Sequence, residues 1–354
     1  MMIGNQADLA VTSMDLNDPG QAAAIDAFVL AHPASTPFHR PAWMLGVEKA
    51  TGNRAHMLVA VGPSGWIRGL LPLHHMKSRL FGEALVSSAF AVDGGILAED
   101  PVAIAALAGA AQGLARDAGG LSMELHGGPG PEGWQPYSEH VGFAGPLAAD
   151  DEAQLAAVSR KHRAEVRKGL ANSALRVEIG RHARLIRDHH RVYSESVRNL
   201  GTPVFPARLF NEILHRFGDD ADIAVVYEGQ RPVSAVLTLY HGGAAMPYWG
   251  GGVKDARRLR SNELLYFRLM THARARGMTH FDFGRSKKDS GPVAWKRSFG
   301  FEPRPLLYHV WTPDGNGRDI DPRNPKYQRR IDLWKKLPLP VANLIGPFIS
   351  RGLG

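Results

Sequence analysis

The sequence predicts two mixed α/β domains in tandem, and three observations lead to this fold class. With 354 residues, of which 44% are hydrophobic, the chain is long enough to bury two cores. The same order of helices, hairpin strands, strand, helix and strand occurs twice along it. Short echoes mark matching places: Ser35-Thr36-Pro37-Phe38 with Gly201-Thr202-Pro203-Val204-Phe205, and Met123-Glu124-Leu125 with Phe281-Asp282-Phe283. We interpret the repeat as a tandem duplication, and two unrelated mixed domains are the alternative.

The first half is predicted to hold helices at residues 21–30, 41–50 and 101–117, and strands at 9–12, 56–61, 67–75, 84–91 and 121–125. Pro33 and Pro37 end the first helix, whereas Pro41 suits the first turn of the second. The Gly62-Pro63-Ser64-Gly65 turn joins two of the strands into a hairpin.

The second half repeats this plan, with helices at 183–200, 206–217 and 261–276 and strands at 223–227, 233–240, 245–250, 280–283 and 306–311. The predicted domains are therefore residues 1–150 and 151–314, followed by a tail of different composition at 315–354. This order of elements is that of an N-acetyltransferase-like (GNAT) fold. Its mixed sheet separates in the middle and leaves a cleft for a thioester, which is an argument from fold analogy.

Residues 245–311 are predicted to carry the site, because a strand–helix–strand crossover places ligands at strand ends and at the helix N-terminus. Gly250 and Gly251, with Gly252, end the first strand where a ligand would approach backbone amides. Arg258 and Arg260 precede the helix and Asn262 begins it, where the helix dipole favours an anion. This part of the sequence predicts an acyl-transfer site for a phosphate-bearing substrate.

A basic stretch separates the two halves. Arg163 and Arg167, together with Arg160, fall on one face of a helix predicted within residues 153–172. Such a face is most often a solvated surface. Its position between two domains favours the other interpretation, in which it holds phosphates.

Composition restricts the function classes. The formal charge of +8 favours an acidic partner such as a nucleotide, tRNA, phosphorylated carrier or anionic membrane face. Without cysteine, the chain has no disulfide, thiol nucleophile or thiolate metal site. The adjacent histidine pairs point in different directions, and no HExxH motif occurs, so we expect no metal site. We also expect no signal peptide and no transmembrane helix.

The tail combines a basic amphipathic segment at residues 326–336 with an apolar segment at 337–354, which Pro338, Pro340 and Pro347 interrupt. It is too short and too interrupted to span a bilayer. Docking onto the protein itself and lying on an anionic membrane face are the two interpretations, and the first is slightly preferred.

Several motifs occur together in order: Ser159-Arg160-Lys161-His162-Arg163, Asn199-Leu200-Gly201-Thr202-Pro203, Tyr248-Trp249-Gly250-Gly251-Gly252, Asp282-Phe283-Gly284-Arg285-Ser286 and Trp295-Lys296-Arg297-Ser298-Phe299-Gly300-Phe301. With them the chain resembles the FemAB-like branch of the GNAT superfamily, and in particular the FemAB-related proteins that accompany exosortase and exopolysaccharide systems. The resemblance implies two GNAT-like domains with one working cleft.

The resemblance also implies an activated donor, either acyl-CoA or aminoacyl-tRNA, as co-substrate. The sequence departs from the family in two places. It has no helical coiled-coil arm like that of some tRNA users, and Arg257-Arg258-Leu259-Arg260-Ser261-Asn262 replaces the glycine-containing loop of ordinary CoA-binding members. The first departure is unfavourable to tRNA, and the second to CoA.

Three residues are the candidate catalytic groups. The resemblance implies that Trp295 and Lys296 form the aromatic–lysine pair that stabilises the transition state, whereas a surface lysine beside a buried tryptophan is the other interpretation. Asp282 lies between two phenylalanines in a strand. It is either a general base with a raised pKa or, as we prefer, half of a structural ion pair with Arg285.

Further candidates surround these groups. Arg285 and Ser286 follow the carboxyl end of the strand, where ligand contacts are usual. Tyr248 orients the acceptor or is an ordinary half-buried strand residue. Asn199 faces the expected cleft or, more often in such a position, caps the helix. The backbone amides near Gly250 are candidates for holding an oxyanion.

Together these patterns predict a cytoplasmic N-acyltransferase, either free or peripheral on the inner membrane face, that acylates an amine of a glycan, peptide or lipid-linked precursor in cell-envelope or exopolysaccharide assembly. The alternative is a non-catalytic membrane-surface scaffold of an exopolysaccharide assembly system. An RNA-binding role is the weakest hypothesis, because the basic face has no interleaved aromatic side chains.

Overall fold

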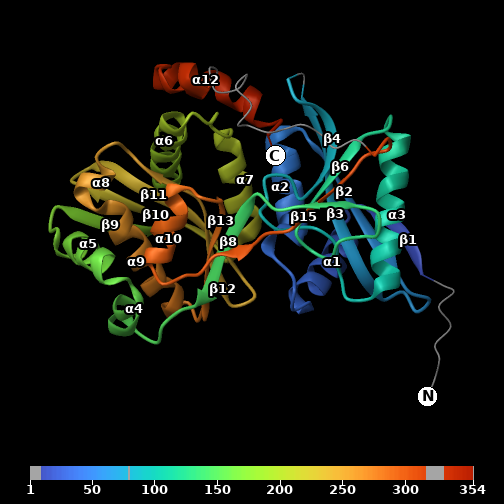
Figure 1. Cartoon of the computed structure of the whole chain (residues 1–354), viewed down its shortest axis with the longest axis horizontal. Helices are drawn as coiled ribbons and strands as arrows, with labels where there is room; N and C mark the ends of the chain where they lie inside the picture. Colours follow the sequence, from blue (N-terminus) through green and yellow to red (C-terminus); the bar gives the residue numbers. More distant parts are fainter. Residues whose placement is uncertain (1–8, 79, 316–330, 354) are drawn as a thin grey trace. The chain divides into compact units, whose positions relative to one another are not determined.

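The computed structural model describes residues 9–78, 80–315 and 331–353, and these form two compact units (Figure 1). Unit 1 consists of residues 1–138, 307–320 and 351–354, and unit 2 consists of residues 139–306 and 321–350. Neither unit is one continuous stretch of sequence, so each is described by itself.

Unit 1 is built on a mixed sheet with strand order β1-β2-β3-β4-β6-β15-β7, and β5 pairs with β3. The strands are β1 (Ala10–Met14), β2 (Arg54–Val61), β3 (Ile67–Ser78), β4 (Gly82–Ser87), β5 (Leu97–Ala98), β6 (Ser122–His126), β7 (Gln135–Tyr137) and β15 (Tyr308–Trp311). The helices are α1 (Pro19–Ala31), the 3-10 turn η1 (Pro37–His39), α2 (Pro41–Thr51) and α3 (Pro101–Asp117). In Figure 1, α3 covers one face of this sheet, and α1 and α2 cover the other.

Local chemistry explains where the helices of unit 1 begin. The side chain of Asp18 accepts a hydrogen bond from the backbone N–H of Gln21 at 2.9 Å, and Asp100 accepts one from Val102 at 2.8 Å. A proline stands in the first turn of α1, α2 and α3, where its missing N–H costs nothing. The alanine-rich α3 then buries Leu107 and Ala111 against the sheet.

Unit 2 is built on a second mixed sheet, with strand order β14-β8-β13-β12-β11-β10-β9. The strands are β8 (His140–Pro146), β9 (Leu175–Gly180), β10 (Ala221–Glu228), β11 (Arg231–His241), β12 (Ala244–Gly252), β13 (His280–Lys287) and β14 (Arg304–Pro305). The helices are α4 (Asp151–Ala157), α5 (Arg160–Ala171), α6 (Ala183–Leu200), α7 (Ala207–Phe217), the 3-10 turn η2 (Gly218–Asp220), α8 (Ala256–Leu259), α9 (Ser261–Ala275), α10 (Gly291–Ser298) and α12 (Leu339–Ser350).

The sheet of unit 2 has a core on each face. On one face, α9 packs Leu265 and Phe267 into a cluster with Phe281, Phe283 and Phe299. On the other face, α6 and α7 contribute aromatic side chains that contact β12, for example Phe210 with its ring 5.2 Å from that of Trp249. Both faces of β10 and β11 are therefore buried, and their sequences are nearly continuous apolar runs.

The two units have equivalent topologies, and this confirms the predicted tandem of GNAT-like domains. In each, the chain runs strand, helix, helix, hairpin, strand, helix, strand: β1, α1, α2, β2, β3, β4, α3 and β6 correspond to β9, α6, α7, β10, β11, β12, α9 and β13. β4 pairs in parallel with β6, and β12 pairs in parallel with β13.

Each sheet is completed by a strand from the other half of the sequence. β8 follows the residues of unit 1 in sequence but pairs antiparallel with β13 of unit 2. Conversely, β15 follows the residues of unit 2 but pairs antiparallel with β6 of unit 1. Residues 306–311 were predicted as the last strand of the second half, and the structure places Tyr308–Trp311 in the sheet of unit 1. The predicted ranges 1–150 and 151–314 take no account of this exchange.

The parallel pair β12–β13 separates soon after it begins. Only Ala244 with His280 and Ala245 with Phe281 are paired, and beyond them the two strands share no further pairing within the described residues. The predicted separation in the middle of the mixed sheet is therefore present in unit 2.

Some elements differ from the sequence prediction. The helix predicted within 153–172 is two helices, α4 and α5, because Val158 is extended (ψ 136°) and fully buried between them. The apolar tail forms α12, with Pro340 in its first turn and Pro347 inside it. The tail's predicted basic segment lies partly outside the described residues. No helix of the described part of the chain is long and apolar enough to cross a membrane.

Candidate functional site

The side chain of Lys296 binds the backbone carbonyls of a bulge in β13, the strand that diverges from β12. The pairing of β13 with β8 shifts register between Asp282 and Arg285, so the carbonyls there have no regular strand partner. The Nζ of Lys296, on α10, donates hydrogen bonds to the carbonyl oxygens of Phe283 at 2.8 Å, Gly284 at 3.2 Å and Arg285 at 2.9 Å. One ammonium group has three N–H donors, and here all three have protein partners.

Burial controls the charge of this lysine and of its neighbour Asp282. Burial lowers the pKa of Lys296 to about 8, and the nearby Asp282 opposes that shift. The Lys296 ammonium lies 5.3 Å from the ring centre of Phe143, which adds a favourable cation–π contact. Burial also raises the pKa of Asp282, whereas the Gly284 N–H, which donates to its Oδ1 at 2.7 Å, and Lys296 lower it.

Trp295 belongs to the core behind this bulge. Its ring centre lies 4.8 Å from those of Tyr266 and Phe299 and 5.7 Å from that of Phe283. The His162 ring of α5 lies 6.2 Å away. These contacts fix α10 against β13 and so fix the direction of the Lys296 side chain.

The glycines of β12 allow close packing. A Cβ atom on Gly250 would lie 2.7 Å from a methyl group of Val236, and one on Gly251 would lie 2.3 Å from the hydroxyl of Ser196 on α6. A Cβ atom on Gly252 would lie 2.5 Å from that of Ala256. No larger residue fits without a shift of its neighbours. Tyr248, just before them, is half-buried with its ring 5.1 Å from that of Trp249.

The predicted anion site at the start of α9 is engaged by protein groups. Arg260 has a left-handed backbone (φ 60°), and its guanidinium pairs with Glu165 of α5. Asn262 accepts a hydrogen bond at 2.7 Å from Ser234 of β11, and Ser261 is fully buried. A Cβ atom on Gly169 would lie 2.8 Å from the Arg260 carbonyl, so α5 packs closely on this turn.

The remaining predicted ligand residues divide into anchored and exposed ones. Arg163 donates to the carbonyls of Ala156 at 2.6 Å and Val158 at 2.9 Å, so it caps the end of α4. Arg258 pairs with Glu228 at 3.8 Å. The side chain of Arg258 is nonetheless 67% exposed, and those of Arg167, Asn199 and Arg285 are exposed as well. Ser286 is buried at 7% exposure, and its hydroxyl has no hydrogen-bond partner among the described residues.

The structure therefore brings the predicted residues together in two groups. Asp282, Arg285 and Lys296 share the bulge of β13, and Trp295 supports it. Gly252 and Asn262 lie together at the end of β12, where a Cβ atom on the glycine would lie 2.9 Å from the Asn262 Oδ1. Arg163 caps α4 rather than joining either group.

Several residues that build this site were not predicted from the sequence. Phe143 lies on β8, whose apolar alternation with Val141 was a usable strand signal but is interrupted by Gly142 and Gly145. Ser196 and Ser234 lie against the glycine strand and the start of α9, and no sequence pattern distinguishes them from other serines. The glutamate partner of Arg260 lies among the basic residues of α5.

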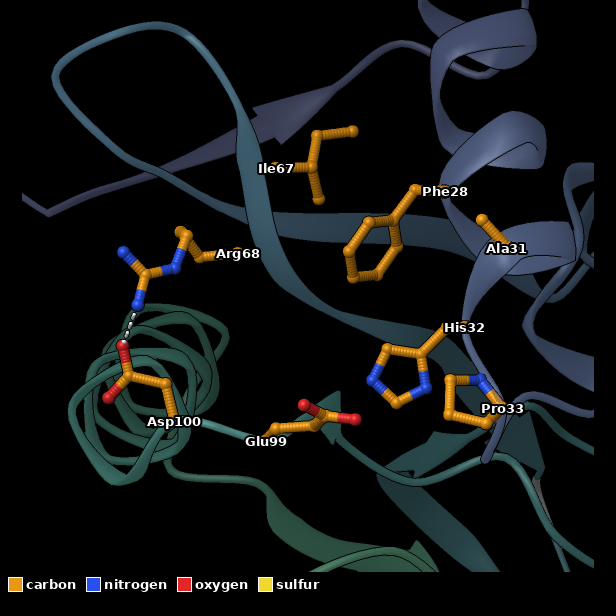
Figure 2. Close-up of a pocket in the computed structure, with 8 residues that line it drawn as sticks. All are labelled: Phe28, Ala31, His32, Pro33, Ile67, Arg68, Glu99 and Asp100. Atoms are coloured by element: carbon orange, nitrogen blue, oxygen red, sulfur yellow. Dashed lines mark hydrogen bonds and ion pairs between the residues drawn. The ribbon is translucent and has the colours of Figure 1, made fainter.

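Two cavities lie away from this chemistry. Figure 2 shows a cavity of about 460 Å³ in unit 1, lined by Phe28, His32 and Ile67 and by the Arg68–Asp100 ion pair of 2.6 Å. A second cavity, of about 450 Å³, lies in unit 2 between α5, β9 and α9. No predicted site residue lines either one.

Comparison with known proteins agrees with this topology. Residues 156–297, from the end of α4 to Arg297 just beyond Lys296, match the family model described as an acetyltransferase (GNAT) domain. The chain has a FemAB-like GNAT acyltransferase fold. No curated protein sequence matches it.

Solved structures with this GNAT fold include that of FemX, which is 16% identical with a TM-score of 0.64 over 85% of this chain and 96% of that chain. The C-terminal domain of a putative lysylphosphatidylglycerol synthetase from Agrobacterium fabrum is 15% identical, with a TM-score of 0.56 over 84% of this chain and 92% of that one. A tandem GNAT protein from the clavulanic acid biosynthesis pathway is 13% identical, with a TM-score of 0.54 over 88% and 100%. At these identities the likeness shows the fold alone.

The GNAT assignment confirms the predicted family resemblance, the tandem fold and the acyltransferase class. GNAT domains use acyl-CoA as co-substrate. Among the described residues, no group of three or more histidine, aspartate or glutamate side chains is placed to hold a metal ion.

Proposed function

We propose that unit 2 transfers an acyl or aminoacyl group from an activated donor to an amine of a cell-envelope precursor, at the place where β12 and β13 diverge. The observation that carries this proposal is the pairing of these strands, which ends at Ala245 and Phe281. Beyond that point the two strands are no longer paired with each other within the described residues, and a place where neighbouring strands diverge is a usual ligand site. The carbonyls of Phe283, Gly284 and Arg285 there already bind Lys296, so a ligand would meet the other groups of these edges.

The equivalent place in unit 1 is filled, which supports unit 2 as the catalytic unit. β4 and β6 pair at three successive positions, and the N–H of His126 then donates to the Ser87 hydroxyl at 2.8 Å. The segment that follows β4 is held by buried contacts: the Ala89 N–H donates to His74 at 3.1 Å, and the Gly94 N–H donates to the His126 carbonyl at 2.8 Å. These hydrogen bonds leave no comparable strand edge in unit 1.

The bulge of β13 suits the chemistry of acyl transfer to an amine. The amine nitrogen forms a bond to the acyl carbon, the bond from that carbon to the donor oxygen or sulfur breaks, and the amine gives up a proton. Asp282, whose pKa is raised by burial, is the proposed acceptor of this proton. Its proximity to the diverging edge supports this role.

Lys296 is proposed as a positioning residue rather than a group that touches the substrate. Its three hydrogen bonds to backbone carbonyls fix the bulge that carries Asp282 and Arg285. Because it is charged below pH 8 and lies in a buried setting, its field also favours a negative charge developing on the acyl oxygen.

The donor is proposed to be an aminoacyl or acyl ester or thioester, with an envelope glycan, peptide or lipid-linked amine as acceptor. FemX and the lysylphosphatidylglycerol synthetase domain share the fold, and the name of the synthetase indicates that it attaches lysine to a lipid. The start of α9 favours a donor other than free CoA, because the guanidinium of Arg260 pairs with Glu165 and is not free to bind a diphosphate. An exopolysaccharide precursor remains the acceptor that the sequence favours.

The test offers the purified full-length chain a panel of acyl-CoAs and aminoacyl-tRNAs with labelled amine acceptors. We expect one donor class to raise the unfolding temperature and to pass its label to the acceptor. Asp282→Asn should lower the transfer rate by roughly a hundredfold, whereas Asp219→Asn, at a side chain that is 98% exposed, should leave it unchanged. Equal rates for the two variants would remove Asp282 from the mechanism.

A non-catalytic scaffold is the second candidate, and the exposed apolar surface of the tail favours it. The panel separates the two functions, because a scaffold gives neither donor protection nor label transfer.

A further inference from the structure

Helix α12 has its polar side chains toward the protein and its apolar side chains outward, the reverse of an ordinary surface helix. The helix lies beside α6 (Figure 1). Its buried residues are the small ones Ala342, Gly346 and Ser350, one helical turn apart, and the last two lie against Val204 in the segment that follows α6. Its two polar side chains also point inward: the Asn343 Nδ2 donates to the Ser194 hydroxyl at 3.4 Å, and Ser350 donates to the Val204 carbonyl at 2.9 Å. The Asn343 Nδ2 and the Ser350 hydroxyl are thus used for docking.

The outward side of α12 is entirely apolar. We call the set Val341, Leu344, Ile345 and Phe348 the outer face; it includes two pairs of residues one turn apart. Leu344 and Phe348 are 70% and 68% exposed, and Val341 and Ile345 are 42% and 37% exposed. No charged residue occurs in the 12 residues of the helix. An exposed helix face normally carries the charged residues, so this pattern is the reverse of the ordinary one.

The segment just before α12 carries basic and apolar groups, and the stem of Lys335 lies near Gly201 at the end of α6. Lys335 and Lys336 are exposed, and Leu333 beside them is 67% exposed. This segment is held in place, because Trp334 is buried and a Cβ atom on Gly201 of the α6 terminus would lie 2.5 Å from Ile331. A single acidic side chain, Asp332, lies 3.9 Å from Lys335.

We propose that the outer face of α12, with Lys335 and Lys336, binds the surface of an anionic lipid bilayer. The helix is about 18 Å long at 1.5 Å per residue, against roughly 30 Å for the hydrocarbon core, so it lies in the interface rather than spanning it. Apolar side chains enter the acyl boundary while the lysines contact anionic headgroups.

The chemistry of the patch favours lipid over a protein partner. A specific protein interface surrounds an apolar centre with hydrogen-bonding groups, which fix the orientation of the partner. The outer face offers none, since Asn343 is turned to Ser194 of α6 and Ser350 to Val204, in the segment between α6 and α7. A bilayer needs no such directional groups, and its negative surface complements the lysines.

If lipid binds at the outer face, α12 and α6 lie between the lipid surface and β12 of the candidate site. Ser194 of α6 contacts α12, and Ser196, two residues further along α6, lies against Gly251 of β12. The distance between a lipid-linked amine and the candidate site would then be short. The lipid binding itself does not depend on the proposed acyl transfer.

The test measures co-sedimentation of the full-length protein with vesicles. We expect binding to vesicles of equal parts phosphatidylcholine and phosphatidylglycerol, and weaker binding to phosphatidylcholine alone. The double variant Leu344→Gln/Phe348→Gln should lose about tenfold in affinity, which is ~1.4 kcal/mol. The matched control is Leu30→Gln/Trp66→Gln in unit 1, whose side chains are 57% and 75% exposed and which should bind as the wild type does.

A charge variant and an oligomer measurement complete the design. Lys335→Gln/Lys336→Gln should weaken binding to the anionic vesicles and leave binding to phosphatidylcholine unchanged. All variants should unfold at the wild-type temperature, because the altered side chains are exposed. Failure of the wild type to bind anionic vesicles, or equal binding by the outer-face variant, would overturn the proposal. So would a wild-type dimer that the outer-face substitutions convert to a monomer, because the occupant would then be a second copy.

Discussion

At the scale of single residues, Lys296 illustrates what sequence reasoning can and cannot provide. The resemblance placed it in the site, and the structure places it on α10 with its ammonium bonded to carbonyls of β13, the strand that carries Asp282. The carbonyls that bind it belong to a bulge, and a bulge depends on the register of β13 with β8, which the sequence does not reveal. The alternative of a surface lysine is wrong, because Lys296 is only 8% exposed.

Replacing Lys296 should therefore destabilise the protein as well as lower its activity. In Lys296→Met the three carbonyls lose their donor, and we expect the free energy of unfolding to fall by about 2 kcal/mol at neutral pH. The matched control is Arg297→Met, one residue further along and 57% exposed, which should change it by less than about 0.5 kcal/mol. Denaturant titration measures both. Equal stability of the two variants would show that the hydrogen bonds to the bulge contribute little.

The same lysine predicts a pH dependence with a definite sign. Its pKa is about 8 in the folded protein and 10.5 in the unfolded chain, so between these values the unfolded state binds more protons. The free energy of unfolding of the wild type should thus rise relative to Lys296→Met as pH increases through this window, by up to roughly 3 kcal/mol. Paired denaturant titrations across that pH range measure the difference. A constant difference would contradict the lowered pKa.

At the scale of elements, the glycines of β12 have a packing role that the sequence did not indicate. They were predicted as backbone donors to a ligand, which stays a prediction. The structure adds that α6 approaches this strand so closely that the Ser196 hydroxyl occupies the space of a side chain on Gly251. The sequence cannot reveal such an approach, because it depends on the distance between two elements that are far apart in the chain.

Gly251→Ala should accordingly destabilise unit 2, by about 1–3 kcal/mol. Gly109→Ala is the matched control, since this glycine lies in the exposed interior of α3 with nothing within 4 Å of a new Cβ atom. There alanine should raise the free energy of unfolding by up to about 1 kcal/mol. The two substitutions add the same methyl group, so thermal or denaturant unfolding that moves in the same direction for both would refute the steric argument.

The elements that were predicted correctly have strong local signals. Proline caps and apolar periodicity located α1, α2 and α3, and the Gly62–Gly65 turn located the hairpin of β2 and β3. β8 and β9 were missed. Gly142 and Gly145 interrupt the alternation of β8, and β9 lies at the edge of its sheet with no fully buried residue.

At the scale of the whole molecule, the repeat was readable from the sequence and the strand exchange was not. Both halves show the same order of elements because each has its own helix and strand signals. Which sheet β8 or β15 joins depends on long-range pairing, and an apolar strand pattern is the same in either sheet.

The exchange predicts that unit 1 needs residues beyond 306. A chain ending at residue 306 lacks β15 and leaves β6 and β7 without the strand that joins them. We expect the amides of β6 to exchange hydrogen far faster in that truncation than in one ending at 315, which retains β15. Both truncations lack α12 and the residues after it, so the comparison isolates the strand. Equal protection of β6 in the two chains would show that unit 1 folds without the exchange.

The position of β15 also has a consequence during synthesis. The ribosome makes most of the first sheet before it reaches Tyr308, and at about 5–20 residues per second the remaining stretch from β7 takes on the order of ten to thirty seconds. During that interval β6 of the nascent chain has an unpaired edge. Such an edge can pair wrongly with a strand of a neighbouring polypeptide. The half that is translated first is thus among the last to mature, and chaperone demand should fall on it.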